Sequence, residues 1–92
     1  MAIISFWFFK EILLNSEYQK IDIFTNNGTR KIDMTLVSDS NSDIFFSWDE
    51  IKLDGILKPK EIFCIEQIKK ESIFVKGSGS MRIWAHELNT KE

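Results

Sequence analysis

The sequence predicts an α+β domain in which one N-terminal helix packs on a five- to six-stranded antiparallel sheet or small barrel. Three observations lead to this expectation. The chain has 92 residues, of which 43% are hydrophobic, including eight Phe and three Trp. From residue 20 onward, short runs of alternating polarity are separated by turn-forming dipeptides. Residues 4–15 carry apolar side chains on nearly every face, as a buried helix does.

The length and charge indicate a folded single domain. A chain of 92 residues lies near the low end of the usual domain size, so residues 1–92 are expected to form one unit. Disordered chains combine low hydrophobicity with high net charge, whereas this chain has a net charge of −2.

The N-terminal segment allows two readings. A helix over residues 4–15 is favoured slightly. Its residues at helical spacing are Trp7, Phe8, Glu11, Ile12 and Asn15. The alternative is a strand through Ile3–Phe9 followed by a helical turn, because β-branched and aromatic residues are enriched there. The segment is too short for a membrane span, which needs about 20 apolar residues.

The next strands are predicted in order along the chain. Residues 20–25, KIDIFT, alternate in polarity, and Asn27-Gly28 follows. Asn-Gly is a strong hairpin signal because both residues tolerate positive φ. A return strand is expected to place Ile32, Met34 and Leu36 on one face.

The second half continues the strand pattern. DIFFSW, residues 43–48, brings Ile44, Phe46 and Trp48 to one face. Residues 49–59 fit either a short helix or a wide loop that ends at Pro59. Further strands are expected in EIFCIEQI, SIFVKG and MRIWAH, with the glycine-rich GSGS of residues 77–80 as a tight turn.

The charge balance and the single cysteine limit the function classes. The computed pI is 5.4, and Arg30 and Arg82 are the arginines, which disfavours a dedicated nucleic-acid binder. Cys64 is the one cysteine, so the chain can form neither an internal disulfide nor a zinc site built on several cysteines. We expect Cys64 to be a small buried hydrophobe and the protein to be cytoplasmic.

The stretch DSNSDIFFSWDE partly matches an EF-hand calcium loop. Asp39, Asn41, Asp43 and Glu50 occupy the first, third, fifth and twelfth positions of that pattern. The sixth position requires Gly, because the backbone turns sharply there, and this chain has Ile44. The expectation is therefore a polar turn followed by a buried strand, with no calcium bound.

No catalytic motif is present in the sequence. His86 has no second His to complete a metal site, and GSGS lacks the Lys and helix of a phosphate-binding loop. We therefore expect neither an enzyme nor a bound metal or cofactor.

A cluster of acidic residues is the strongest candidate for a binding surface. Such a patch can steer a small protein onto a basic partner, and an aromatic residue beside it can serve as an anchor. The candidate protein-binding residues are Asp39, Asp43, Trp48, Asp49, Glu50 and Asp54. The expected function is a non-enzymatic protein-binding domain, specifically a toxin-neutralising immunity or antitoxin-type inhibitor of a basic toxin or nuclease domain. It is expected to be a monomer or dimer with no membrane association.

An alternative rests on a resemblance. A helix followed by strands that carry Asn27-Gly28, Asp39 and Lys76-Gly77 is a little similar to the Sm-like RNA-binding fold. The Gly expected in that family's second strand is absent here, since IDMTL contains none. The resemblance implies a small-barrel RNA-binding protein that forms a ring.

Overall fold

The computed structural model describes residues 2–23, 32–68 and 70–90. In these ranges the chain forms eight strands and no helix. The strands are β1 (Ala2–Leu13), β2 (Gln19–Asp22), β3 (Ile32–Ser38), β4 (Ile44–Ser47), β5 (Gly55–Leu57), β6 (Ile62–Ile68), β7 (Ser72–Lys76) and β8 (Ser80–Thr90). The predicted fold class is therefore wrong, because the described chain is all-β.

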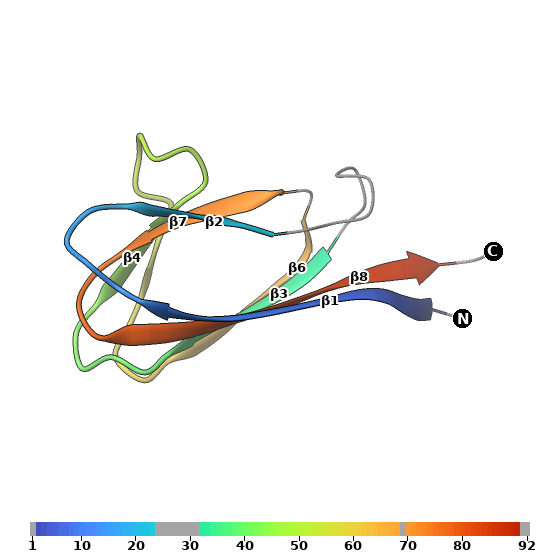
Figure 1. Ribbon diagram of the computed structural model, residues 1–92, viewed down its shortest axis with the longest axis horizontal. Helices are drawn as coiled ribbons and strands as arrows, with labels where there is room; N and C mark the ends of the chain where they lie inside the picture. Colours follow the sequence, from blue (N-terminus) through green and yellow to red (C-terminus); the bar gives the residue numbers. More distant parts are fainter. Residues whose placement is uncertain (1, 24–31, 69, 91–92) are drawn as a thin grey trace.

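The strands form two four-stranded antiparallel sheets. The first sheet has the order β1-β8-β3-β6, and the second has the order β2-β7-β4-β5. Figure 1 shows the second sheet lying above the first, with both ends of the chain at the same end of the molecule. This arrangement is a two-layer sandwich, in which each sheet can bury one face against the other.

The N-terminal helix was predicted wrongly because residues 2–13 form β1. This strand pairs with β8 from Ala2 opposite Thr90 to Leu13 opposite Ser80. β-Branched and aromatic side chains lose rotamer freedom in a helix but fit a pleated sheet. Together with the long ladder to β8, this preference outweighs the helical spacing of the apolar residues. The alternative reading placed a strand at 3–9 correctly, but the helical turn after it is also wrong.

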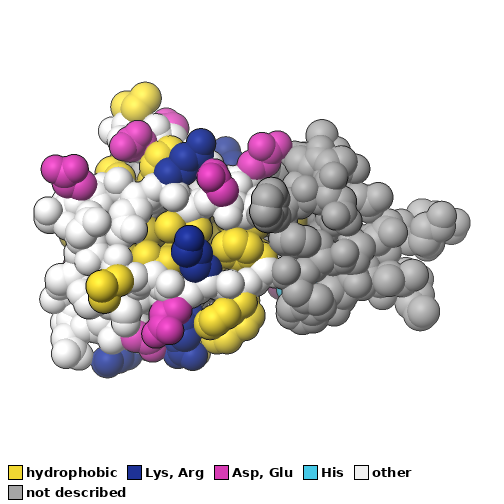
Figure 2. All heavy atoms as spheres, in the orientation of Figure 1, with side chains coloured by type: hydrophobic (Ala, Val, Ile, Leu, Met, Phe, Trp, Pro, Cys, Tyr) yellow, Lys and Arg dark blue, Asp and Glu magenta, His cyan; other side chains and the backbone are white. Residues whose placement is uncertain are grey.

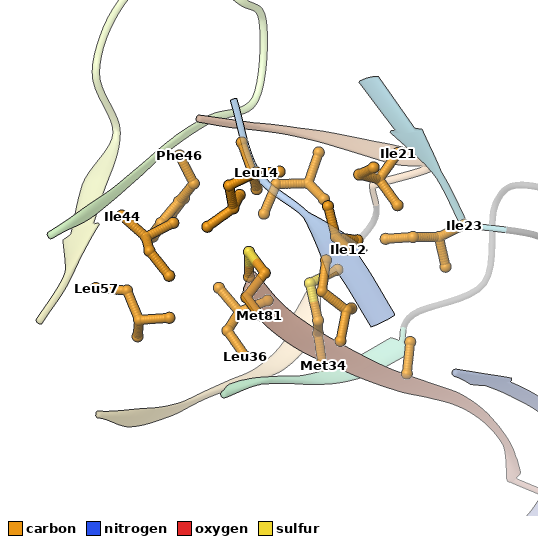
Figure 3. Packing of buried hydrophobic residues seen from close by; sticks show 14 of the residues in the cluster. Ile12, Leu14, Ile21, Ile23, Met34, Leu36, Ile44, Phe46, Leu57 and Met81 are labelled. Carbon is orange, nitrogen blue, oxygen red and sulfur yellow. The ribbon is translucent and has the colours of Figure 1, made fainter. Parts of the chain in front are cut away.

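The core lies between the two sheets and draws on both. Figure 3 shows Met81, Leu36 and Met34 of the first sheet pointing toward Ile44, Leu57 and Ile21 of the second. The cluster contains Ile12, Leu14, Ile21, Ile23, Ile32, Met34, Leu36, Ile44, Phe46, Leu57, Ile73, Val75, Met81, Ile83 and Ala85. Burial of this apolar surface is the main favourable term in folding.

The Asn27-Gly28 turn lies outside the described residues, but the hairpin predicted around it is wrong. β2 pairs with β7 in the second sheet, whereas β3 pairs with β6 and β8 in the first. The chain therefore changes sheets between residues 23 and 32. Local turn chemistry favoured a hairpin, but β2 and β3 pair with strands of different sheets.

Other predictions about single strands are confirmed. Ile32, Met34 and Leu36 are buried on one face of β3, and β6, β7 and β8 occupy the predicted runs. The turn between β7 and β8 includes Gly79 at a φ of +86°, where a Cβ would come within 3.0 Å of Ser40 Oγ. Glycine meets both constraints of this turn.

The exposure of Cys64 contradicts the expectation that it is buried. Cys64 is a free, exposed cysteine on β6, which is the last strand of the first sheet. It lies opposite Thr35, on the face of the sheet that points away from the core. The apolar run around it suggested a central strand, but its position at the sheet edge leaves it accessible.

The contact of Gly55 with Phe46 predicts the cost of a small substitution. The two residues pair across the β4–β5 ladder, and a Cβ on Gly55 would lie 2.6 Å from Phe46 Cε2. Because Phe46 is buried and cannot move aside freely, Gly55→Ala should destabilise the fold by about 1–3 kcal/mol in urea unfolding. In a Phe46→Leu background the same substitution should cost less, and an equal cost in both backgrounds would refute the clash.

Candidate functional site

The loop between β4 and β5, residues 48–54, projects from the body of the sandwich at the top of Figure 1. It carries two large aliphatic side chains in solvent: Ile51 is 88% exposed and Leu53 is 51% exposed. Figure 2 shows an apolar side chain at the tip of this projection, with acidic side chains nearby. We call residues 48–54 the apex loop.

The apex loop is built on a buried hydroxyl at the end of β4. Ser47 is completely buried, and its Oγ accepts hydrogen bonds from the backbone N–H groups of Asp49 and Glu50, at 3.2 and 2.9 Å. Its hydroxyl also donates a hydrogen bond to Asp49 Oδ1, at 3.1 Å. The hydroxyl thus provides an acceptor for two backbone N–H groups that would otherwise have no partner at the end of the strand.

Asp49 closes the next part of the loop. Its Oδ1 accepts hydrogen bonds from the backbone N–H groups of Ile51, at 2.9 Å, and Lys52, at 3.2 Å. These two bonds are the main reason that the pKa of Asp49 lies below its ordinary value of 3.8. The carboxylate therefore helps to fix the backbone on which Ile51 is carried.

Asp54 and Trp48 hold the base of the loop. Asp54 Oδ2 accepts a hydrogen bond from the Trp48 backbone N–H at 2.8 Å, and the Asp54 N–H donates to the Phe46 carbonyl at 3.0 Å. The Trp48 ring is packed edge-on to Phe46, with 6.0 Å between centroids, and the Lys70 ammonium lies 5.6 Å from its centroid. Trp48 therefore anchors the loop to the core through part of its ring.

Glu50 is the remaining predicted residue of the loop. Its backbone has a φ of +69°, a left-handed conformation that is uncommon outside glycine. Among the described residues, its side chain takes no part in the hydrogen bonds that shape the loop, and it is exposed. Glu50 can therefore present its charge to a partner without loss of the loop's internal contacts.

Asp39 and Asp43 lie at the other end of β4. Both oxygens of Asp39 accept hydrogen bonds from Arg82, at 2.9 and 3.0 Å, which raises the pKa of Arg82. Asp43 Oδ2 lies 3.5 Å from Lys58 Nζ. Both carboxylates thus have cationic partners within the chain.

The structure divides the six candidate residues into two groups. Trp48, Asp49, Glu50 and Asp54 belong to the apex loop, whereas Asp39 and Asp43 precede β4. The strand between them, Ile44–Ser47, spans about 13 Å at ~3.3 Å per residue. Sequence reasoning treated the carboxylates as one surface and missed Ile51 and Leu53. The available signal was an aliphatic pair set among turn-forming acidic residues in DEIKLDG.

The calcium pattern does not form a continuous loop here. Residues 44–47, its sixth to ninth positions, are β4, and Ile44 is buried in the core. Within the ranges that the structure describes, no group of three or more His, Cys, Asp or Glu side chains is placed to hold a metal ion. Those ranges also contain no helix that is long and apolar enough to cross a membrane.

We compared the chain with protein-family models, curated proteins and solved structures, and none of the three comparisons gave a match.

The hydrogen bonds of the ionised Asp49 side chain predict how the apex loop responds when that carboxylate is lost. Because the folded pKa is lowered, ionised Asp49 stabilises the loop above pH 3.8, and this contribution is lost as the pH falls through the lowered pKa. Asp49→Ala should speed hydrogen exchange at the Ile51 and Lys52 amides at neutral pH. Asp49→Asn, which keeps an acceptor oxygen, should do so less. Unchanged exchange of both amides in Asp49→Ala would contradict this role.

Proposed function

We propose that this chain is a non-enzymatic protein-binding domain and that the apex loop is its docking element. The observation that carries the proposal is the 88% exposure of Ile51 on a loop held by its own hydrogen bonds. Burial of a fully exposed aliphatic side chain contributes about 1.5–3 kcal/mol. Because the backbone is fixed before binding, little ordering entropy opposes that gain.

The charges around the loop indicate the chemistry of the partner. The apex loop contains three carboxylates, on Asp49, Glu50 and Asp54, and one cation, Lys52, whose Nζ lies 3.9 Å from Asp54 Oδ1, so the loop carries a net negative charge. The complementary surface is an apolar pocket with a basic rim, since opposite potentials speed encounter and suppress wrong partners. A toxin or nuclease domain with a basic surface has this chemistry. Inhibition of such a partner is our more specific proposal.

The Sm-like alternative loses its structural basis. That resemblance implied a helix before the first strand, and residues 2–13 form β1 instead. An acidic loop tip also repels phosphate groups, whose neutralisation by cations supplies most nucleic-acid affinity.

The binding role of Ile51 can be tested with a matched pair of substitutions. A partner is first isolated by co-purification from the source cells and then purified, so that its affinity is measured by calorimetry. Ile51→Lys should weaken binding by about 10- to 100-fold, as loss of a central apolar anchor does. Ile62→Lys places the same change on β6, where the side chain is 66% exposed, and should leave affinity unchanged. Equal affinities for both variants and the wild type would exclude the apex loop as the docking element.

The free carboxylate of Glu50 predicts a separate kinetic effect. Glu50→Lys reverses a charge without touching the hydrogen bonds that shape the loop, so folding should be preserved. Association with the partner should slow by about tenfold at low salt and by less at high salt, where screening is strong. Stopped-flow measurements over a range of salt concentrations test this expectation. An association rate that is unaffected at every salt concentration would remove the electrostatic part of the proposal.

A further inference from the structure

Strand β6 leaves an apolar sheet edge accessible. It is the last strand of the first sheet, and among the described residues only β3 pairs with it. Its first residues are Ile62, 66% exposed, Phe63, 42% exposed, and Cys64, also exposed. Edge strands are usually protected by charges, prolines or bulges, because their free N–H and C=O groups can pair with another chain.

The hydrogen-bond phase of β6 shows which backbone groups face outward. The Ser38 N–H donates to the Glu61 carbonyl at 2.9 Å, so Glu61 faces β3. Successive residues of a strand point their backbone N–H and C=O groups toward opposite neighbours, so the backbone groups of Phe63 and Ile65 also point toward β3. The N–H and C=O groups of Ile62, Cys64 and Glu66 therefore point away from the sheet.

Regular strand geometry stops at both ends of this free edge. At one end, Gln67 has a φ of +56° and its N–H donates to Asp33 Oδ1 at 2.9 Å, where the β3–β6 register shifts. At the other end, a turn joins the Glu61 N–H to the Lys58 carbonyl at 3.0 Å. A bulge or turn interrupts regular pairing. The open segment is thus residues 62–66, whose midpoint is Cys64.

We propose that two copies of this chain pair through β6, antiparallel, about a two-fold axis at Cys64. In this register Cys64 lies opposite Cys64 of the other copy, and Ile62 lies opposite Glu66. Every outward N–H and C=O of the five-residue segment then meets a partner, which joins the two first sheets into one continuous sheet. A two-fold axis makes the interface self-complementary, as in most dimers.

The side chains favour a second copy as the occupant. Phe63 of one copy lies opposite Ile65 of the other, and such aromatic–β-branched pairs stabilise antiparallel ladders. The one charged residue of the segment, Glu66, lies opposite Ile62 and not opposite another carboxylate. The pairing therefore covers the exposed part of Phe63 without placing like charges together. It uses the first sheet and leaves the apex loop free, so it is independent of the proposed binding function.

The assembly is tested first by sedimentation or light scattering of the purified chain at micromolar concentrations. The wild type should show the mass of two chains. Ile62→Glu should show the mass of one, because it sets a carboxylate directly opposite Glu66 of the other copy, and like charges in that position are destabilising. Ile51→Glu, the same change on the apex loop, should remain dimeric. A monomeric wild type, or a dimer that survives Ile62→Glu, would overturn the proposal.

Cross-linking of the unmutated chain tests the register without relying on a variant that folds. Residues in a hydrogen-bonded antiparallel pair have Cα atoms about 5.5 Å apart, so a short bis-maleimide should join Cys64 of the two copies in high yield. The yield should stay high on dilution to low micromolar concentration. A dimer that the reagent does not cross-link would rule out an axis at Cys64.

Discussion

The antiparallel ladder between β1 and β8 is the contact on which the other elements of the structure depend. It pairs Ala2 with Thr90 and Leu13 with Ser80, so it brings the two ends of the chain together. This register also sets Ile12 opposite Met81, and both are buried. Because side chains alternate along a strand, this register places Phe8 and Ile12 of β1 toward the core and leaves Phe9 and Leu13 exposed on the other face.

The ladder also determines where the second sheet lies. The N–H of Leu14, just after β1, donates to the Gly79 carbonyl at 2.9 Å, and Gly77 donates to Asn15 at 2.8 Å. These bonds hold the chain leaving β1 against the turn that joins β7 to β8. β7 then pairs with β4, which ends at the buried Ser47. The position of the apex loop is thus set by rigid strands, which is the usual way in which binding loops are supported.

The apex loop combines exposed aliphatic side chains with a polar, hydrogen-bonded interior. Exposed aliphatic side chains favour collapse onto the protein, whereas Ile51 and Leu53 remain in solvent. Their exposure is maintained because polar groups occupy the loop's interior: Ser47, Asp49 and Asp54 bind its backbone N–H groups. The acidic residues that suggested a charged docking patch are in large part the scaffold of an apolar one. Glu50 and the tip side chains face outward.

Much of the strand pattern was predictable from the sequence. β3 buries Ile32, Met34 and Leu36 as their period-2 spacing indicates, and the glycine-rich turn before β8 is correct. Two kinds of information were not local. β1 has apolar residues on both faces, which fit either period, and its pairing with distant β8 decided the matter. β2 and β3 belong to different sheets and pair with strands far along the chain. The turn signal between them therefore predicted the wrong neighbour.

The candidate site shows the same limit. Asp49 and Asp54 lie in one loop, but carboxylates that bind backbone N–H groups are indistinguishable in sequence from carboxylates that face a partner. Asp39 was grouped with them by spacing, although Arg82, far along the chain, pairs with it. The exposure of Ile51 follows from this network, and no property of a single residue reveals it.

The central claim is that the apex loop is rigid before it meets a partner. Backbone ¹⁵N relaxation of the free protein tests it most directly, since order parameters report motion on the picosecond to nanosecond timescale. We expect values of about 0.85 for Asp49 to Asp54, equal to those of the flanking strands β4 and β5. Values below about 0.6 at Ile51 and Leu53 would contradict a preformed docking element.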